Sequence, residues 1–287
     1  MGLLDRYGVQ LGLTRLAGWL ASRRLGPITR GMVRRFIRQY QVNMNEAAQP
    51  NPAAYATFND FFTRALKPGA RPLAHAPWVC PVDGAVSQLG PIHQGQIFQA
   101  KGHAYAAQEL LACSATEAQQ WANGTFATIY LSPRDYHRIH MPCAGRLLRM
   151  TLVPGLLHSV NPATAARVPA LFARNERLIT WWQTPHGPMV LVLVGATIVG
   201  SMATAWHGVV NAQRDGQMHT WDYSDQSIEL AQGDEMGRFM LGSTVVLLWP
   251  AQTLQLAPAM QPKATVRMGQ VLGLLSHDAP AKPHTPQ

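Results

Sequence analysis

The feature that most constrains this fold is a long stretch without charged side chains. Residues 178–213 contain no Asp, Glu, Lys or Arg, which fits either a membrane-spanning helix or strands buried inside a protein. Glycines and prolines interrupt the stretch, among them Pro185, Gly187, Pro188, Gly195 and Gly200. The segments Val190–Val194 and Thr197–Val199 are rich in β-branched residues, which favour strands. The pattern therefore predicts buried strands separated by glycine turns and argues against a single helix.

A β-rich body is predicted from Pro81 onward, because short apolar or alternating runs are separated there by Gly, Pro and Asn. The expected strands are Ala85–Leu89, Phe126–Leu131, Arg146–Val153, Leu178–Trp182, Met189–Val194, Val245–Trp249 and Thr265–Val271. A helix is expected near Gln108–Ala122, and a shorter one around Phe58–Leu66 with Thr57 as its cap. With 47% apolar and 14% charged residues, the chain has the composition of a globular protein with a large core.

The N-terminal segment differs from the rest because it combines helical periodicity with clustered arginines. Apolar residues recur at helical spacing on both sides of the break at Gly26–Pro27. They are Leu13, Leu16, Ala17 and Leu20, then Met32, Val33, Phe36, Ile37 and Tyr40. The arginines lie between and across from these positions, as in a helix that lies in a membrane interface with a cationic rim. The alternative is a helix that packs on the body of the protein and exposes a basic face to solvent.

Most of the net charge of +9 lies in this segment. Residues 1–42 contain eight arginines against Asp5 alone, so seven of the nine excess positive charges precede residue 43. Such a segment attracts nucleic acid or an anionic membrane surface, and its apolar residues favour the membrane. No nucleic-acid partner is expected, because the segment lacks a recognisable binding motif. No secretory signal is expected either, since the start lacks a basic region followed by an uninterrupted apolar core.

The chain is expected to divide into three parts. Residues 1–44 are expected to form membrane-docking helices, residues 45–276 a β-rich catalytic domain, and residues 277–287 a disordered tail rich in Pro and His. The cysteines are odd in number and lack the spacing of a metal site, so we expect buried thiols in a reducing compartment and no bound metal. They are Cys80, Cys113 and Cys143.

Four local features carry the chemical argument, and each has a plainer alternative. The Gly-Ser-Thr triplet at 242–244 is, by itself, most often a turn that leads into a strand. His137 and His140 fit acid–base groups, weak metal ligands or ordinary core histidines. Asp83 precedes a glycine, where an aspartate is usually a turn residue. The fourth feature is Ser159–Pro162 followed by Leu171–Arg177, and its polar cluster Arg174–Arg177 is interpreted as a structural network near the site in preference to a catalytic group.

Taken together, these features resemble the bacterial phosphatidylserine decarboxylase family. The resemblance runs over nearly the whole chain, with its blocks in one order, and only the tail after Ser276 lacks it. The blocks are Leu13–Trp19, Thr57–Phe62, Lys101–His103, Tyr130–Arg138, Val194–Ser201 and Gly237–Thr244. The turns Pro81–Gly84 and Met268–Gly273 also resemble the paired turns of barrel-sandwich folds related to biotinyl domains. The expected fold is therefore α+β and β-rich, a barrel-sandwich-like body with N-terminal amphipathic helices.

The family resemblance implies that the chain cuts itself between Gly242 and Ser243. The Ser243 hydroxyl would attack the Gly242 carbonyl to form an ester. β-Elimination and hydrolysis with loss of ammonia would then leave a covalent pyruvoyl group, the one cofactor expected, on an α chain of residues 243–287 beside a β chain of residues 1–242. The resemblance assigns His140 as the base that activates the serine and Asp83 as its orienting partner, in the manner of a serine-protease triad.

The same resemblance implies decarboxylation of phosphatidylserine to phosphatidylethanolamine and CO2. Loss of CO2 leaves a carbanion, so an electron sink is required, and the pyruvoyl carbonyl supplies it through a Schiff base with the substrate amine. His137 is the expected proton donor to the former α carbon. A lipid substrate also gives the basic N-terminal segment a purpose, which is peripheral docking on the anionic cytoplasmic face of the bacterial inner membrane. A homodimer of αβ units is the family expectation.

Two other classes of protein fit parts of the pattern. A serine hydrolase that uses Ser243, His140 and Asp83 would keep an intact chain and a serine that reacts with fluorophosphonates. A non-catalytic lipid-binding protein would bind anionic vesicles, and replacing Ser243 with Ala would change neither its size nor any activity. The decarboxylase hypothesis predicts two chains on a denaturing gel and an α chain that resists Edman sequencing.

Overall fold

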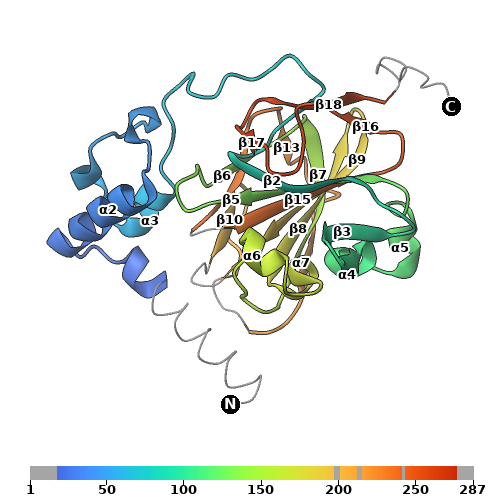
Figure 1. The fold of residues 1–287 in the computed structure, drawn as a ribbon, viewed down its shortest axis with the longest axis horizontal. Coiled ribbons are helices and arrows are strands. Elements are labelled where there is room, and N and C mark those ends of the chain that lie inside the picture. The colour runs from blue at the N-terminus through green and yellow to red at the C-terminus, as the bar shows by residue number, and fades with distance from the viewer. Residues whose placement is uncertain (1–17, 197–200, 212–214, 241–242, 277–287) are drawn as a thin grey trace.

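Helices dominate the chain before residue 78 and strands dominate it afterwards (Figure 1). The computed structural model describes residues 18–196, 201–211, 215–240 and 243–276. The expected first helix, apart from helical residues 18–22, lies outside the described residues, as do Gly242 and the tail 277–287. The expected α+β class, rich in strands, is confirmed.

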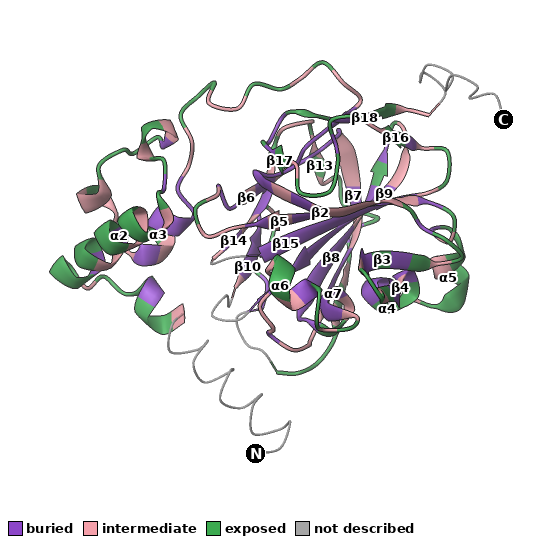
Figure 2. Ribbon diagram, in the orientation of Figure 1, coloured by how far each residue is buried: buried purple, intermediate pink, exposed green. Residues whose placement is uncertain are grey.

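A nine-stranded antiparallel sheet forms the centre of the molecule. Its spatial order is β12 (His219–Asp222), β7 (Gly145–Val153), β8 (Arg177–Thr184), β9 (Gly187–Val194), β15 (Ser243–Trp249), β5 (Thr125–Leu131), β2 (Gly84–Pro91) and β17 (Thr265–Val266), with β13 (Glu229–Leu230) paired to β7. Strand β15 lies in the middle of the sheet, between β9 and β5, and all of its residues are buried. Figure 2 shows the same concentration of buried residues along the central strands. Strands with apolar neighbours on both faces carry continuous apolar runs, as β15 does.

The strands expected from the apolar runs are present. In the described residues, the charge-free stretch forms β8, β9 and β10 (Met202–Thr204), which are mostly buried, and the short exposed strand β11 (Gly208–Val209), so the choice of strands over a membrane-spanning helix is confirmed there. The segment Thr197–Val199 lies outside the described residues. The last expected strand is divided by a turn into β17 and β18 (Val271–Leu275). Within the described part of the chain, no helix is both long and apolar enough to cross a membrane.

Two smaller sheets complete the side of the molecule that carries the candidate site. One has the order β11, β10, β14 (Glu235–Phe239) and β6 (Arg138–His140), and the other has the order β1 (Trp78–Val79), β18 and β16 (Leu254–Leu256). They share a hydrophobic cluster with one face of the central sheet, which includes Val245, Leu247, Phe239 and Leu272. The described sheets are open, and none of them closes into a barrel.

The other face of the central sheet is covered mainly by a hairpin and short helices. Val246 and Leu248 alternate with the residues above along β15 and belong to a second cluster, as the two-residue period of a strand requires. This cluster also contains Ile97, Leu110 and Phe172. The covering elements are β3 (Gln96–Ala100), β4 (His103–Ala106), α4 (Ala107–Leu111), α5 (Ala115–Gln119), α6 (Pro162–Ala165) and α7 (Leu171–Arg174).

The N-terminal helices have a small core of their own. They are α2 (Pro27–Tyr40), the short 3-10 helices η1 (Met44–Glu46) and η2 (Pro52–Ala54), and α3 (Phe58–Phe62). Thr57 caps α3 as expected, and it forms a capping box in which its hydroxyl and the Asp60 carboxylate each accept a backbone N–H at 3.0 Å. Val33 of α2 packs with Phe58, Phe61 and Phe62 in one cluster. A division of the chain at residue 44 therefore cuts through this core.

Candidate active site

Ser243 begins the central strand with a buried, unpaired hydroxyl. The residue is 0% exposed, and its Oγ has no hydrogen-bond partner among the residues that the structure describes. Ser243 has the same parity along β15 as Val245 and Leu247, so its side chain is on the face that packs against the smaller sheets. A buried hydroxyl that forgoes hydrogen bonding costs free energy, which native structures keep mainly where function requires it.

His137 carries a second buried polar atom without a partner. The residue is 0% exposed; its Nδ1 donates to the carbonyl oxygen of Asp135 at 2.8 Å, and its Nε2 has no partner in the described part of the chain. The Phe62 ring lies against the imidazole, with ring centroids 4.1 Å apart. Burial, and then the positive charge of Arg64, lower the pKa of His137 to about 3. The imidazole is therefore neutral near pH 7, with a free lone pair on Nε2.

His140 lies at the end of β6 and is held through both ring nitrogens. Its Nδ1 lies 2.8 Å from the carbonyl oxygen of Gly233, so Nδ1 carries the proton and donates it. Its Nε2 then accepts the hydrogen bond from the Tyr136 hydroxyl at 2.9 Å. Burial lowers the pKa of His140, and the Gly233 carbonyl opposes that shift. The residue is thus a neutral base whose lone pair is covered by a tyrosine.

Asp83 is buried and fully engaged, but with partners other than the expected ones. Arg71 donates from Nε to both carboxylate oxygens and forms a short ion pair through Nη2, while the backbone N–H of Met268 donates at 2.9 Å. The expected orientation of His140 by Asp83 is not formed in this structure, since the Gly233 carbonyl takes that place. The segments that carry Asp83 and His140 are linked by a backbone hydrogen bond, in which the His140 N–H donates to the Pro81 carbonyl at 2.9 Å.

The central sheet places Asp83 and Ser243 near each other without direct contact. Ala85, Tyr130 and Thr244 lie side by side on β2, β5 and β15. Two strand spacings separate the outer pair by roughly 10 Å, and Asp83 and Ser243 come just before them. No hydrogen bond links the three side chains of the expected triad to one another, although all three lie in described residues.

The cluster Arg174–Arg177 makes the contacts of a structural network. Arg177 is buried and donates to the carbonyl oxygens of Glu109 and Leu110, and also to those of Ala173 and Asn175. Glu109 and Leu110 lie in the last turn of α4 and Ala173 lies in the last turn of α7, where backbone carbonyls commonly take partners from outside the helix. The Asn175 amide bridges two further backbone carbonyls, and Glu176 accepts from Asn211 at 2.6 Å. These contacts favour the structural interpretation of the cluster.

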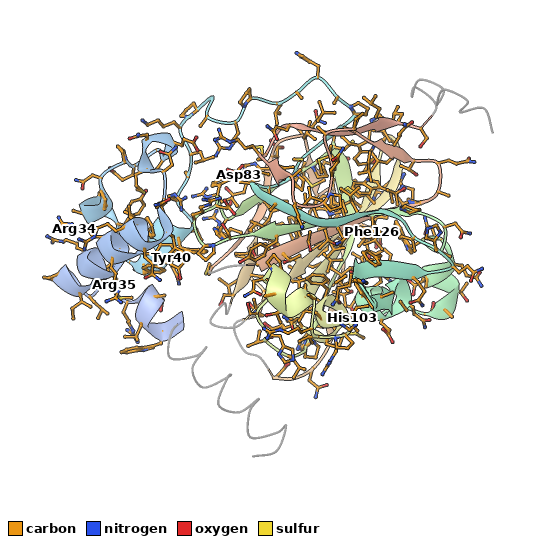
Figure 3. The ribbon with its side chains drawn as sticks, in the orientation of Figure 1. Arg34, Arg35, Tyr40, Asp83, His103 and Phe126 are labelled. Carbon is orange, nitrogen blue, oxygen red and sulfur yellow. The ribbon has the colours of Figure 1, made fainter. Side chains whose placement is uncertain are left out.

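His103 and the three cysteines add no further group to the candidate site. His103, on the β3–β4 hairpin, is far from Asp83, as the labelled side chains show (Figure 3). Cys80 and Cys143 are buried free thiols, whereas Cys113 is only half-buried, against expectation, because it follows the short helix α4 near the surface. Within the described ranges, no three His, Cys, Asp or Glu side chains gather in the way a metal ion requires.

Sequence reasoning missed three residues that shape the site. Arg71 forms an ion pair with Asp83, and the Tyr136 hydroxyl hydrogen-bonds Nε2 of His140. The positive charge of Arg64 helps to lower the pKa of His137. Arg64 lies two residues after the end of α3, so no pattern along the chain connects it with the histidine. For Arg71 the sequence offers only the general rule that a buried carboxylate needs a cation, and nothing along the chain says which of the 24 Lys and Arg residues supplies it.

Comparison with known proteins identifies the class and then the family. The family described as Phosphatidylserine decarboxylase matches residues 58–274, and a second family description, PSD, matches residues 10–41. A protein of Acidovorax ebreus named phosphatidylserine decarboxylase proenzyme is 63% identical over 260 residues, which cover 91% of this chain and 92% of the relative. Proteins with the same name from Delftia acidovorans (64% over 272 residues; 94% and 96% covered) and Chromobacterium violaceum (64% over 264 residues; 92% and 94% covered) are equally similar.

These similarities define the chain as an enzyme of the decarboxylase class, related to proteins that are made as proenzymes. The chain belongs to the phosphatidylserine decarboxylase family.

Proposed function

We propose that this chain decarboxylates phosphatidylserine to phosphatidylethanolamine and CO2, using a pyruvoyl group made from Ser243. The observation that carries the proposal is the buried Ser243 hydroxyl without a partner, close in the fold to the buried and unpaired Nε2 of His137. Both lie beside the β6–β14 pair, since Phe239 donates its N–H to the His137 carbonyl only four residues before Ser243. A serine that is to be consumed gains nothing from a permanent hydrogen-bond partner.

The proposed maturation uses groups that this chain supplies. The Ser243 oxygen attacks the Gly242 carbonyl carbon, the C–N bond breaks, and the amide becomes an ester. His140 accepts the hydroxyl proton, because its depressed pKa keeps Nε2 unprotonated near neutral pH. Tyr136 must first release that nitrogen. β-Elimination and hydrolysis then give ammonia and separate residues 1–242 from residues 243–287.

The residues around Ser243 fit the group that would replace it. A ketone has no hydrogen-bond donor, so it accepts the position of a hydroxyl that already lacks partners. When present, this group supplies the carbonyl that accepts electrons as the substrate loses CO2. The neighbouring apolar residues exclude water, which favours loss of the charged carboxylate as neutral CO2.

His137 is the proposed proton donor to the former α carbon. In the described state, Nδ1 holds the ring proton against Asp135, and Nε2 has none. His137 must therefore gain a proton at Nε2 before it can donate one. Its low pKa makes the protonated ring a strong acid, which suits donation to a carbanion.

Docking on an anionic membrane surface is proposed for the N-terminal helices. Trp19 is 51% exposed and Ile28 62% exposed, and Arg34 and Arg35 extend from α2 away from the body (Figure 3). Exposed apolar residues beside arginines are the features of a helix that lies in the headgroup region. A peripheral position on the cytoplasmic face of the inner membrane, and a homodimer of αβ units, complete the proposal.

The test is the intact mass of the purified protein together with its activity on vesicles that contain phosphatidylserine. We expect two chains, with the smaller one blocked to Edman sequencing, and release of CO2. The Ser243→Ala variant is expected to stay as one inactive chain. A single unbroken chain that still decarboxylates the lipid would rule out the pyruvoyl mechanism, and a fluorophosphonate-reactive Ser243 would favour a hydrolase.

A further inference from the structure

A cavity of about 270 Å³ lies between the N-terminal region and the strand-rich body. We call it the arginine pocket, because four arginines line it: Arg64, Arg71, Arg134 and Arg267. Its walls come from segments far apart in the sequence, including the turn after α3, the loop between β5 and β6, and β17. Asp83 lies at this side of the body, where it faces the N-terminal helices (Figure 3).

The acidic residues of the pocket are already engaged. Glu46 and Asp83 both pair with Arg71, and Glu46 also lies 3.5 Å from Arg267. Asp135 accepts hydrogen bonds from the backbone and hydroxyl of Ser132, both at 2.7 Å. No acidic side chain of the pocket therefore pairs with Arg64 in the part of the chain that the structure describes.

Arg64 is a buried cation with unused donors. The residue is 5% exposed; Nη2 donates to the carbonyl oxygens of Arg134 and Asp135, whereas Nε and Nη1 have no partner within the described ranges. Burial lowers its pKa, because the charged form loses hydration. Asp83, Asp135 and Glu46 act on its charge from a distance, and the Phe61 ring centroid lies 5.6 Å from the guanidinium carbon, but none of them accepts a hydrogen bond from Nε or Nη1 in the described residues. Two buried donors without acceptors cost free energy, so these two donors are expected to have a ligand. The fork formed by Nε and one Nη suits two oxygens of a single oxyanion.

The pocket adjoins the candidate active site. Leu131 pairs with Ser243 across β5 and β15, and the pocket wall formed by Arg134–Tyr136 begins three residues further along the chain. His137 follows that wall directly. The Asp135 carbonyl accepts from both Arg64 and His137, at 3.4 and 2.8 Å. A ligand group bound at Arg64 is therefore close enough to His137 and Ser243 for one short substrate headgroup to reach from Arg64 to them.

We propose that the arginine pocket binds the phosphodiester of the lipid headgroup, with Arg64 as the residue that grips its oxygens. This inference rests on the proposed function, since it takes the substrate to be a phospholipid with an amino-acid headgroup. In such a headgroup, the carbon that bears the phosphate ester is bonded to the carbon that bears the amine and the carboxylate. Phosphate at Arg64 thus sets the amine and the carboxylate towards Ser243.

The substrate carboxylate is the other oxyanion that Arg64 could hold, and the chemistry argues against it. A guanidinium bound to the carboxylate stabilises the charge that decarboxylation removes, so it raises the barrier to reaction. The phosphodiester keeps its charge throughout, and its binding energy is equally available in the ground state and in the transition state. Arg64 should therefore affect substrate binding far more than the chemical step.

Binding is tested on the Ser243→Ala precursor, which keeps the pocket and performs no chemistry. Ligand-observed NMR titrations use three probes, namely glycerophosphoethanolamine, inorganic phosphate and free serine. We expect Arg64→Gln to weaken glycerophosphoethanolamine about tenfold to a hundredfold, as for loss of a charge-assisted contact, and to leave serine unchanged. Arg64→Lys should retain part of the affinity. Arg146→Gln, on β7 at the far end of the sheet, removes an equal charge as the control.

Unchanged affinity for glycerophosphoethanolamine in Arg64→Gln would overturn the proposal, and Arg64-dependent binding of serine would assign the pocket to the carboxylate instead. In the cleaved enzyme, we expect Arg64→Gln to raise KM with kcat within a few-fold of the parent, whereas an equal loss in kcat at unchanged KM would contradict the assignment. Thermal unfolding identifies a variant that fails to fold, and Arg64→Lys then carries the test. The binding measurements need neither cleavage nor activity, so they still report on the pocket if the proposed function fails.

Discussion

The N-terminal region and the strand-rich body differ in how completely they bury their large side chains. In the body, Trp78 and Trp249 are 0% exposed and belong to a cluster that spans three sheets. In the N-terminal region, one small cluster around Val33 and Phe61 forms the core, while Trp19 and Ile28 remain more than half exposed. The body can hold buried polar atoms in fixed places, whereas the N-terminal region keeps apolar surface available to a partner. Chemistry and docking therefore place opposite demands on the two regions.

The largest effect is expected from the body, at His140. His140→Asn removes the basic nitrogen while its amide can still donate to the Gly233 carbonyl, so self-cleavage should slow by about 10²- to 10⁴-fold. A time course of newly made protein on denaturing gels measures it. The exposed His93 provides a control, as His93→Asn should cleave at the parent rate. Parent-rate cleavage in His140→Asn would remove this base from the mechanism.

Trp249 in the body and Trp19 in the N-terminal region test how tightly each region is packed. Trp249→Ala should lower the free energy of unfolding by about 3–5 kcal/mol, because it leaves a cavity in the largest cluster. Trp19→Ala should change it by less than about 0.5 kcal/mol, since the ring is half exposed. Denaturant titration of the cleavage-blocked Ser243→Ala chain gives both values without interference from scission. Equal losses would mean that the N-terminal region is as tightly packed as the body.

Acid should weaken the body selectively through its buried histidines. Folding lowers the pKa of His137 from 6.5 to about 3, so between these values the unfolded chain binds a proton that the folded chain does not. The contribution of His137 to the free energy of unfolding is therefore fully present above pH 6.5. It is lost as the pH decreases, by about 2 kcal/mol between pH 6.5 and 5.0. His140 shifts in the same direction and adds to the loss.

The matched variant for this measurement is His137→Phe. It should be less stable than the parent near pH 7, because the Asp135 carbonyl loses a donor, and the difference should shrink as the pH falls, because the variant has no imidazole to titrate at this position. Denaturant titrations at several pH values compare the slopes. The same slope in parent and variant would show that His137 does not titrate with folding.

The smallest effect is expected on the exposed side of α2. Replacing Arg34 and Arg35 together with Gln should weaken binding to anionic vesicles by about 1 kcal/mol per charge and leave stability unchanged. Vesicle sedimentation at two salt concentrations measures it, because screening should reduce the difference. Arg146→Gln in the body is the control of equal charge. Equal losses from both regions would point to a general attraction without an oriented docking face.

The parts of the fold that the sequence predicts are those with strong local signals. Strands β5, β8, β9 and β15 consist of apolar or alternating runs, and α3 follows a capping sequence, so each is recognisable without its neighbours. Strand β6 was missed because Arg138, Ile139 and His140 carry no such pattern. It exists because it pairs with β14, almost 100 residues later and across an irregular register. Long-range pairing of this kind leaves no trace in a short window.

The candidate site divides in the same way. Family resemblance supplied Ser243, His140 and Asp83 as a triad, and that role stays a prediction; in the structure, Asp83 pairs with Arg71 and His140 donates to the Gly233 carbonyl. The Gly233 carbonyl is a backbone group, so no residue type in the sequence announces it as the partner of His140. Arg64 and Arg71 come from the segment after α3, and only the packed structure brings them to the histidines and to Asp83.

The position of β15 has a consequence for the lifetime of the mature protein. Both neighbours of this strand, β9 and β5, belong to residues 1–242, and β17 and β18 also pair with strands from that part. After the proposed scission, the 45-residue fragment would be threaded through its larger companion with no covalent tether. The uncut chain folds in a unimolecular reaction, whereas the two pieces would have to find each other in solution. The backbone cut would therefore make unfolding irreversible, and an enzyme molecule that unfolds once would have to be replaced by new synthesis.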